Sequence, residues 1–400
     1  MELSGLRSAV AVVGGGPSGL TAAIALASAG LDVTLIARAA PDDNRTTALL
    51  ASSVAALETL GVWDDCRRHA APLAALRIVD ATHRLWRAPE ALFDASEIGL
   101  DAFAWNIENR HLIAALDASA AGMINLRRIL EDATAVDIHS DAVSIRTSGG
   151  ATVSVKLAVG ADGRNSLCRT AAGITVQSEA YPQIALTYNV AHSRPHRNIS
   201  TEFHTEHGPF TTVPLPGDRS SIVCVVDAAE ADHMQALSGE ALNLELERRS
   251  HSLLGKISAL PGHGTFPLVR ESARRFAGER IALVGEAAHR FPPIGAQGLN
   301  LGLRDAAAIA EIAADHPDDP GAPAVTDRYD LERRTDVVTR SFAVDLLNRS
   351  LLSDLLPMQG LRGIGLHLLN TVGPLRRAMM REGVMPRAAQ PKLMRGEALS

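Results

Sequence analysis

The chain has 400 residues; 46% are hydrophobic, 21% are charged, and the formal net charge at pH 7 is −6. This composition excludes a disordered chain, and the negative charge argues against binding to nucleic acid, which needs a basic surface. The length predicts two joined domains, and no uncharged apolar run reaches the roughly 18 residues that a membrane span needs.

The first predicted elements are a strand, a tight turn and a helix in AVAVVGGGPSGLTAAIALASAG (residues 9–30), followed by a strand in DVTLIAR (32–38). The turn has the pattern G-x-G-x-x-G. Its first glycine permits the turn, its second lets a pyrophosphate approach the backbone, and its third lets helix and strand pack closely. The helix N-terminus then offers free N–H groups to the phosphates. The candidate nucleotide-binding residues are Gly14, Gly16, Pro17, Ser18 and Gly19.

The end of the second strand departs from the usual dinucleotide pattern. A carboxylate is expected there to hold the adenosine ribose, but Ala37 occupies the position and Arg38 follows it. These residues leave two interpretations open. Either Arg38 binds the 2′-phosphate of NADP, or the site holds a flavin nucleotide without a ribose carboxylate.

A second motif lies in KLAVGADGRNSLCRTAAGI (156–174), where an apolar strand leads into Asp162 and Gly163. Ligands of open α/β sheets bind at the carboxyl ends of the strands, so this position predicts a second contact with the nucleotide. Ser166 is expected to cap the helix that follows.

A third motif follows in IALVGEAAHRFPPIGAQGLN (281–300), which reads as a buried strand, a carboxylate, a proline segment and a helix from about Gly298. Glycines at a helix start let a flat ligand lie against the backbone, and the helix dipole favours negative charge on that ligand. The candidate cofactor-binding residues here are Gly285, Glu286, Pro293, Gly295, Gln297, Gly298, Leu299 and Asn300.

The order and spacing of the three motifs resemble the flavoprotein aromatic hydroxylases, single-component FAD-dependent monooxygenases with the para-hydroxybenzoate hydroxylase fold. EAAHRFPPIGAQGLNLGLRDA (286–306) is similar to the third motif of the ubiquinone-biosynthesis hydroxylases. Other stretches that agree with this family are 43–50, 97–116 and 207–223. Glu286 stands where the family usually has aspartate and keeps a carboxylate for the ribityl chain, whereas Ala37 lacks the family's ribose contact.

The resemblance implies an α/β fold with an FAD-binding Rossmann-like (GR2-type) domain, an inserted antiparallel β-sheet substrate domain and C-terminal helices. The FAD-binding domain is expected to be discontinuous and to comprise residues 1–75, 100–180 and 275–345. The substrate domain is expected in residues 76–99 and 181–274, and a C-terminal helical segment in residues 346–400.

The same resemblance implies non-covalent FAD, NADPH or NADH as transient electron donor, and O2 as co-substrate. The substrate is a polyprenyl-phenol or another aromatic compound, hydroxylated on the ring through a flavin C4a-hydroperoxide. Arg45 is then placed near the flavin or the pyrophosphate, and Asn109 or Arg110 opens a helix in the region that contacts FAD in this family. The helix start in PPIGAQGLN (292–300) faces the pyrimidine end of the flavin, where reduced flavin carries negative charge.

No catalytic base follows from the sequence. His289, Tyr188, a histidine of the expected substrate sheet and water are all candidates for taking the phenol proton. The histidines lack metal-ligand spacing, and the cysteines are scattered and odd in number, so neither a metal site nor a disulfide framework is expected. The cysteines are Cys66, Cys168 and Cys224.

Two alternatives stay open: a related FAD-dependent aromatic hydroxylase or reductase acting on another phenolic or isoprenoid substrate, and a flavin-binding sensor or scaffold without turnover. A halogenase is disfavoured because Trp63, Trp86 and Trp105 are scattered and do not form its tryptophan motif. The expected location is the cytoplasm, with peripheral contact to the inner membrane and to other ubiquinone-biosynthesis enzymes as hypotheses. The membrane hypothesis rests on residues 351–380, where apolar side chains recur at helical spacing. This stripe comprises Leu361, Ile364, Leu368, Val372, Leu375 and Met379.

Overall fold

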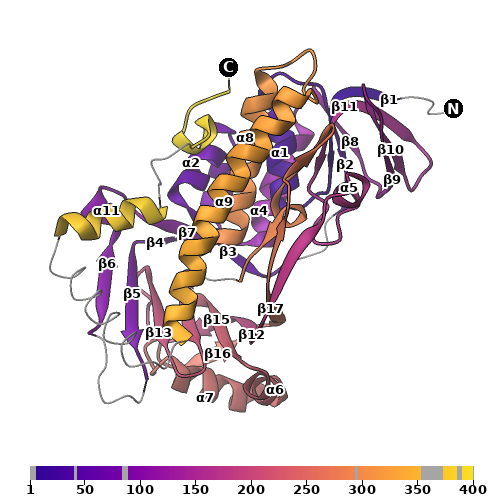
Figure 1. The fold of residues 1–400 in the computed structure, drawn as a ribbon. Coiled ribbons are helices and arrows are strands. Elements are labelled where there is room, and N and C mark those ends of the chain that lie inside the picture. Colours follow the sequence, from indigo (N-terminus) through magenta and orange to yellow (C-terminus); the bar gives the residue numbers. More distant parts are fainter. Residues whose placement is uncertain are drawn as a thin grey trace.

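The computed structural model describes residues 6–39, 43–82, 89–292, 296–352, 373–384 and 390–399, with the backbone alone at 340–352 and 375. Figure 1 shows two stacked regions. One holds a sheet covered by helices, and the other is built around an antiparallel sheet; the long strands β12 (Val176–His192) and β17 (Gly264–Ala273) run between them. Helix α9 (Pro323–Leu352) extends along one side of both regions.

The first sheet has eight strands within the described residues. Its centre is parallel, as expected for strands joined by crossover helices. In spatial order its strands are β18 (Ala277–Gly278), β19 (Ile281–Leu283), β11 (Thr152–Gly160), β1 (Leu6–Val13), β2 (Val33–Ile36) and β8 (Leu126–Ile129), with β10 (Val143–Thr147) and β9 (Ala133–Ile138) paired antiparallel beyond β11.

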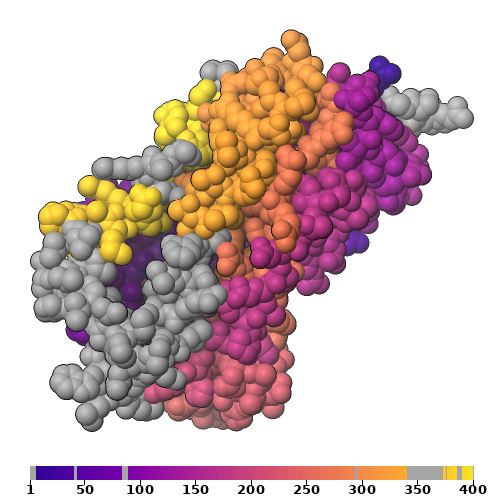
Figure 2. Space-filling view, in the orientation of Figure 1, coloured from indigo at the N-terminus to yellow at the C-terminus, as the bar shows by residue number. Residues whose placement is uncertain are grey.

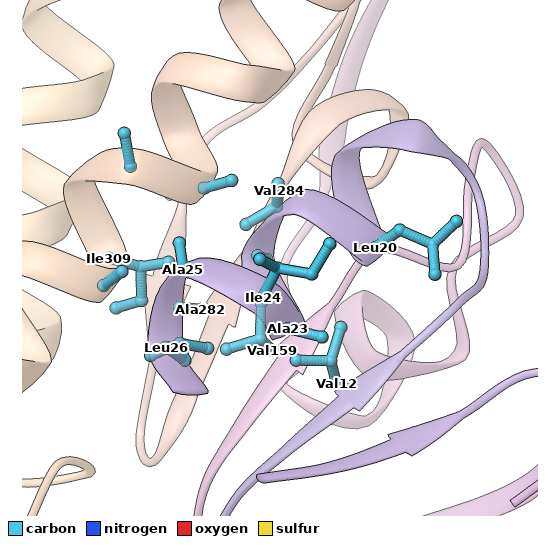
Figure 3. Close-up of a cluster of buried hydrophobic side chains, with 14 of the residues drawn as sticks. Val12, Leu20, Ala23, Ile24, Ala25, Leu26, Val159, Ala282, Val284 and Ile309 are labelled. Carbon is cyan, nitrogen blue, oxygen red and sulfur yellow. The ribbon is translucent and has the colours of Figure 1, made fainter. Parts of the chain in front are cut away.

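The core of this region lies between the sheet and helices α1 (Pro17–Ser28) and α8 (Gln297–Ala314). Figure 3 shows Leu20, Ile24 and Leu26 of α1 among side chains of β1, β11 and β19, with Ile309 of α8 beside them. Apolar residues surround α1 on all sides because the helix is covered by the sheet on one side and by α8 on the other.

The second sheet has nine strands within the described residues. It is antiparallel except where β13 and β5 pair in parallel. In spatial order its strands are β20 (His289–Arg290), β17, β12, β15 (Arg219–Asp227), β14 (Pro209–Leu215), β13 (Ile199–His204), β5 (Ala75–Asp80) and β6 (Ala91–Asp94), with β16 (Ile257–Ala259) paired to β12. Helices α6 (Ala228–Ala236) and α7 (Gly239–Arg249) cover one face of this sheet through a separate hydrophobic cluster.

A small third sheet lies near the junction of the two regions and comprises β3 (Thr46–Leu50), β7 (Ala104–Glu108) and β4 (Ala70–Leu73). The remaining helices are α2 (Ala51–Thr59), α3 (Trp63–Arg67), α4 (Asn109–Ala121) and α5 (Leu167–Ala171), with single 3-10 turns η1 (Ala95–Ile98), η2 (Gly285–Ala287) and η3 (Lys392–Arg395). The three cysteines are buried and free.

Helix α11 (Gly373–Val384) lies beside η1 and β6. Arg376 forms an ion pair with Glu97 and stacks over Phe93, while Met380 and Val384 join a hydrophobic cluster with Ile98. In the space-filling view, α11 forms part of the surface at one side of α9 (Figure 2). Of the apolar stripe noted in the sequence, the residues between 353 and 372 lie outside the described residues, whereas Met379 is 55% exposed.

The α/β fold with an added antiparallel sheet and C-terminal helices is thus confirmed. The sheet pairings agree with the expectation that residues 76–99 and 181–274 build one unit, although β12 and β17 continue toward the first sheet. The exact domain boundaries stay a prediction. No helix in the described part of the chain is both long and apolar enough to cross a bilayer.

Candidate active site

A cavity of about 820 Å³ lies between the two regions, and we call it the main cavity. All three sequence motifs contribute to its wall. The residues that line it from the first motif are Gly16, Pro17, Ser18 and Gly19; from the second, Asp162 and Gly163; and from the third, Gly285, Glu286, Gly298 and Leu299. Because these residues come from the carboxyl ends of three neighbouring strands and from two helix starts, the topology makes one site of them.

The glycine turn between β1 and α1 leaves no space for side chains at two positions. Gly14 has φ +115°, and a Cβ there would collide with the carbonyl oxygen of Ala161. A Cβ on Gly19 would collide with the carbonyl oxygen of Gly14. Gly16 differs, because nothing lies within 4 Å of a Cβ built there. The turn is therefore tightly packed against the protein at Gly14 and Gly19 and open at Gly16. Gly16 is the N-cap of α1, and no side chain caps this helix start.

Ser18 is placed where α1 approaches the third motif. A Cβ on Gly302 of α8 would collide with the Ser18 hydroxyl, and one on Gly285 would lie 2.9 Å from it. Two glycines thus let α1, α8 and the end of β19 approach each other. Ser18 also lines the main cavity, so its predicted contact with the cofactor and its packing role are compatible.

The predicted residue Arg45 belongs to a charged cluster at the wall of the main cavity. Its guanidinium donates hydrogen bonds to Asp43 at 2.8 and 2.7 Å and lies 5.7 Å from the ring centre of Phe266. The Asn109 amide also donates to Asp43 at 2.9 Å. Burial opposes the charge on Asp43, but these hydrogen bonds outweigh it and hold the pKa of Asp43 below its ordinary value. Arg45 is thereby held in the cavity wall as a cation.

Asp162 borders the main cavity, but its carboxylate is engaged in local structure. It accepts hydrogen bonds from the Ser166 hydroxyl at 2.5 Å and from the backbone N–H groups of Leu167 and Cys168 at 2.7 and 3.1 Å. Ser166 caps α5 by accepting from the Arg169 N–H at 2.9 Å, which confirms that expectation. Asp162 therefore fixes the loop that contains Gly163, and its contact with a nucleotide stays a prediction.

The third motif presents its carboxylate to the cavity. Gly285 has φ +62°, and the turn η2 that begins there leaves Glu286 exposed in the wall of the main cavity. Helix α8 begins at Gln297, one residue before the predicted start, and its N-cap residue Ala296 provides no side-chain cap. Gly298 has nothing within 4 Å of a Cβ built on it, so the helix start is open as predicted. Pro293 and Gly295 lie outside the described residues.

Asn300 is buried, and its side chain is occupied by protein groups. Its amide oxygen accepts from the Leu50 N–H at 2.9 Å and the Ser53 hydroxyl at 2.7 Å. Its amide nitrogen donates to the carbonyls of Ala48 at 2.8 Å and Ala296 at 2.6 Å. Asn300 thus ties the start of α8 to β3 and α2. The contact of Asn300 with the cofactor stays a prediction. These hydrogen bonds do not support it, because they already occupy the side-chain amide.

A second cavity of about 400 Å³, the side cavity, opens at the end of β2. It is lined by Ala37 and Arg38 and by Arg110 of α4, whereas the neighbouring Asn109 lines the main cavity. A Cβ on Gly15 would lie 2.8 Å from the Ala37 Cβ, so the turn packs against this position. Arg110 therefore lies in the side cavity together with Ala37, the position at the end of β2 where a ribose carboxylate was expected.

A buried charged network behind the cavity was not foreseen from the sequence. The Asp305 carboxylate accepts from His289 Nε2 at 2.6 Å, from Arg333 Nε at 2.8 Å and from the Gly285 N–H at 3.1 Å. The His289 and Asp305 side chains are fully buried, and that of Arg333 is 2% exposed. Asp305 and Arg333 each lie in a helical pattern 28 residues apart, and no local pattern predicts that they pair.

The opposite wall of the main cavity comes from the second sheet. Side chains of alternate residues in a strand point to opposite faces. Thr187 and Asn189 of β12 line the cavity, whereas Tyr188 packs with the cluster under α6 and α7. Burial raises the pKa of Tyr188 to about 12. Tyr188 touches the cavity border, but this packing does not favour it as the acceptor of a substrate proton.

The residues present fit FAD. The open helix start at Gly16 offers unpaired N–H groups to a pyrophosphate, and Arg45 adds a cation in the same cavity. Glu286 is exposed and lines the same cavity, where its carboxylate can accept hydrogen bonds from a polyol chain. Within the described ranges, no group of three or more histidine, cysteine, aspartate or glutamate residues could hold a metal ion.

The sequence matches the FAD binding domain family over residues 7–341. Ubiquinone hydroxylase UbiL of Rhodospirillum rubrum is 35% identical over 405 residues, which cover 98% of this chain and 93% of that protein. The 3-demethoxyubiquinol 3-hydroxylase of Escherichia coli K12 is 30% identical over 385 residues, which cover 93% of this chain and 97% of that protein.

Solved structures show the same fold. The p-nitrophenol 4-monooxygenase PnpA of Pseudomonas putida DLL-E4 superposes with a TM-score of 0.79 at 19% identity, covering 96% of this chain and 100% of that chain. An HpxO variant of Klebsiella pneumoniae, complexed with FAD, gives a TM-score of 0.74 at 19% identity, covering 95% and 99%. At such identities the likeness supports the fold alone.

The family match spans most of the chain, and the two hydroxylases align with it over nearly their full lengths. The glycine turn and the two other motifs that led to this expectation meet in one cavity. The chain therefore belongs to the ubiquinone hydroxylase family of FAD-dependent monooxygenases, within the FAD binding domain family.

Proposed function

We propose that this enzyme hydroxylates the aromatic ring of a polyprenyl-phenol intermediate in ubiquinone biosynthesis, with NAD(P)H and O2 as co-substrates. The observation that carries the proposal is the main cavity, which has a nucleotide-binding wall on one side and a second wall of strand side chains on the other. The names of the relatives UbiL and 3-demethoxyubiquinol 3-hydroxylase support ubiquinone intermediates as the substrate class.

FAD, once reduced by NAD(P)H, supplies the oxygen-activating chemistry. The chain's own groups bind and orient it. The N–H groups at the start of α1 would hold the pyrophosphate, Arg45, paired with Asp43, would lie in the same cavity wall, and Glu286 would accept hydrogen bonds from the ribityl chain. The start of α8, which is open at Gly298, is the positive end of an 18-residue helix and would stabilise negative charge on the ring of a cofactor bound beside it.

The second wall suits an aromatic ring with a polar substituent and an apolar tail. Thr187, Asn189 and Ser221 supply hydroxyl and amide groups, although Asn189 donates to the Asn44 carbonyl and Ser221 accepts from Thr46. Val223 and Phe266 supply apolar surface in the same wall. A substrate held here would lie between the sheet and the cofactor and would displace water from the place of the oxygen transfer.

The test uses the purified enzyme with short-chain polyprenyl-phenols under ¹⁸O2. We expect NAD(P)H oxidation to accelerate with the correct phenol and one ¹⁸O atom to appear on its ring by mass spectrometry. Hydrogen peroxide measured in the same reaction separates hydroxylation from uncoupled oxidation. Retention of FAD with NAD(P)H oxidation that no phenol accelerates and no labelled product would contradict the proposed hydroxylation.

We also propose peripheral contact with the membrane in which such substrates dissolve. Support comes from α11, where Met379 is 55% exposed and Arg377 and Arg381 are exposed beside it. Basic and apolar groups together favour a bilayer surface with anionic lipids. Flotation with anionic and neutral liposomes tests this: full-length enzyme should float with the anionic ones, and Arg377→Glu combined with Arg381→Glu should reduce that fraction. Equal flotation of both forms would sink the proposal.

A further inference from the structure

Asn189 of β12 places a side-chain amide at the main cavity. The residue is 7% exposed and lines the cavity from the second sheet. Its Nδ2 donates to the Asn44 carbonyl at 2.8 Å. Its Oδ1 has no hydrogen-bond partner among the described residues, and it is not one of the polar atoms that are sealed from solvent without a partner. Because Asn189 lines the main cavity, Oδ1 is open to a molecule bound there.

The contact with Asn44 fixes which way the amide is turned. A backbone carbonyl only accepts hydrogen bonds, so the amide atom beside it must be the nitrogen. Turning the amide over would place its oxygen against that carbonyl. Oδ1 is thereby held on the side away from Asn44. A nearly buried acceptor without a partner costs free energy, which a bound donor can recover.

The polar groups next to Asn189 differ from it. Ser221 lies directly opposite on β15 and accepts from the Thr46 hydroxyl at 2.9 Å and from the Asn106 amide at 3.3 Å. Thr187 lies two residues earlier on β12 and lines the same wall. The hydroxyls of Ser221 and Thr187 can each donate a hydrogen bond, whereas Oδ1 of Asn189 can only accept one. Asn189 therefore selects for a ligand group that carries a donor proton.

The place of Asn189 in the cavity indicates which ligand carries that donor. The residue belongs to the wall built from the second sheet, across the cavity from the glycine motifs that would hold the nucleotide. Val223 and Phe266 add apolar surface to the same wall. An acceptor within apolar surroundings suits an aromatic ring that bears a hydroxyl donor.

We propose that Oδ1 of Asn189 accepts a hydrogen bond from the hydroxyl of the phenolic substrate, so that Asn189 is a substrate-binding residue whose amide is oriented by Asn44. An amide oxygen accepts a hydrogen bond but is too weak a base to take the phenol proton, so the substrate is bound as the neutral phenol. The proposal rests on the proposed function, because it needs a phenol in this cavity, and it adds the residue that positions the ring.

Three variants separate this contact from a structural role. Asn189→Leu has a side chain of similar size but no acceptor, and it also loses the bond to Asn44. Asn189→Asp keeps an acceptor oxygen at the cavity. Asn243→Leu is the matched control, because Asn243 of α7 accepts from the Ala259 N–H at 2.8 Å and does not line the main cavity. Thermal unfolding of each variant reports folding.

The probes are a short-chain prenyl-phenol and the same compound without its hydroxyl. Their dissociation constants are read from the change in flavin absorbance of the FAD-loaded enzyme, without NAD(P)H. Wild type is expected to bind the phenol about tenfold more tightly, the factor that a hydrogen bond of ordinary strength gives. Asn189→Leu should lose this preference, and Asn189→Asp and Asn243→Leu should keep it.

Two results with Asn189→Leu would overturn the proposal. One is a preference for the hydroxyl that equals that of wild type. The other is a loss of FAD affinity by about tenfold, which would assign Oδ1 of Asn189 to the cofactor; we expect FAD affinity to stay within about twofold.

Two further compounds test the contact in wild type alone and cover a variant that fails to fold. An amino group in place of the hydroxyl keeps donor protons, whereas a methoxy group only accepts. The amino compound should bind more tightly than the unsubstituted ring, and the methoxy compound should not. A gain from the methoxy group would show that a donor such as Thr187 binds the substituent, and it would overturn the proposal.

The outcome for the proposed function is read separately. Wild type that holds FAD but neither binds nor hydroxylates a prenyl-phenol would contradict the proposed function and the role of Asn189 with it. Wild type that hydroxylates the phenol, with a hydroxyl preference that Asn189→Leu leaves intact, would contradict the role of Asn189 only.

Discussion

The two walls of the main cavity are built from different parts of the chain. On the first-sheet side, glycines at 16, 19, 285 and 298 line the cavity at two helix starts, and we call this side the backbone wall. On the second-sheet side, it is made of side chains on regular strands, such as Thr187 and Val223. We expect the backbone wall to bind the cofactor, which is the same whatever the substrate. Side chains on a strand can be replaced, and the bound substrate thereby changed, without altering the strand.

The sharpest way to break the backbone wall is Gly14→Ala. The new Cβ would collide with the Ala161 carbonyl at φ +115°, so we expect destabilisation above about 4 kcal/mol and loss of bound FAD. Gly30→Ala is the matched control, because Gly30 has φ +85° with nothing within 4 Å and tests backbone strain alone, at about 1–2 kcal/mol. Thermal unfolding and flavin absorbance per chain measure both effects. Similar losses in the two variants would show that packing against Ala161 is unimportant.

The network behind the backbone wall is expected to show the next largest effect. Asp305→Ala removes the buried carboxylate that pairs with His289 and Arg333, while Arg333 keeps its ion pair with Asp336, so we expect a cost of about 3 kcal/mol. Asp327→Ala, which removes an exposed ion pair with Arg275, is the control and should change the unfolding free energy little. Urea unfolding of the two variants checks this. A loss below about 1 kcal/mol for Asp305→Ala would contradict the structural role of the network.

The same network predicts a pH dependence. Because the folded-state pKa of Asp305 lies below its ordinary value of 3.8, its contribution to stability is fully present above that value and is lost as the pH falls through the lowered pKa. The difference in unfolding free energy between wild type and Asp305→Asn should therefore be constant at neutral pH and shrink in acid. A difference that grows as the pH falls would show the opposite sign and refute this.

The effect of the Glu286 side chain in the backbone wall on FAD binding can be compared with that of Arg38, which lines the side cavity. Glu286→Ala should weaken FAD binding by about 10- to 150-fold, because a hydrogen bond to a charged group contributes roughly 1.5–3 kcal/mol. Arg38→Ala should have a smaller effect, since the Arg38 side chain is 75% exposed. Fluorescence titration with FAD compares the two variants. Equal affinities of wild type and Glu286→Ala would refute the placement of the ribityl chain.

The smallest effect on the cofactor is expected from the second wall. Val223→Phe narrows the cavity on the substrate side and should leave FAD affinity within about twofold, while KM for the phenol rises by about tenfold. Steady-state NAD(P)H oxidation and FAD titration are measured on the same preparation. If FAD affinity falls as much as substrate affinity, the two walls do not divide their tasks in this way.

The sequence by itself determined the features that depend on neighbouring residues. The glycine turn at 14–19, the strand end before Asp162 and the open start of α8 were all predicted, because each needs a backbone conformation that local residues encode. The resemblance of these motifs to a known family then gave FAD and the α/β fold. The Ser166 cap could be predicted for the same local reason.

Tertiary structure decided what depends on residues far apart in the chain. His289, Asp305 and Arg333 meet only because β20, α8 and α9 pack together, and no local pattern identifies such a pair. Packing likewise turned Asn300 toward protein carbonyls and N–H groups and placed Arg110 in the side cavity. The register of β12 put Tyr188 on the face away from Thr187, since moving a strand by one residue exchanges its two faces.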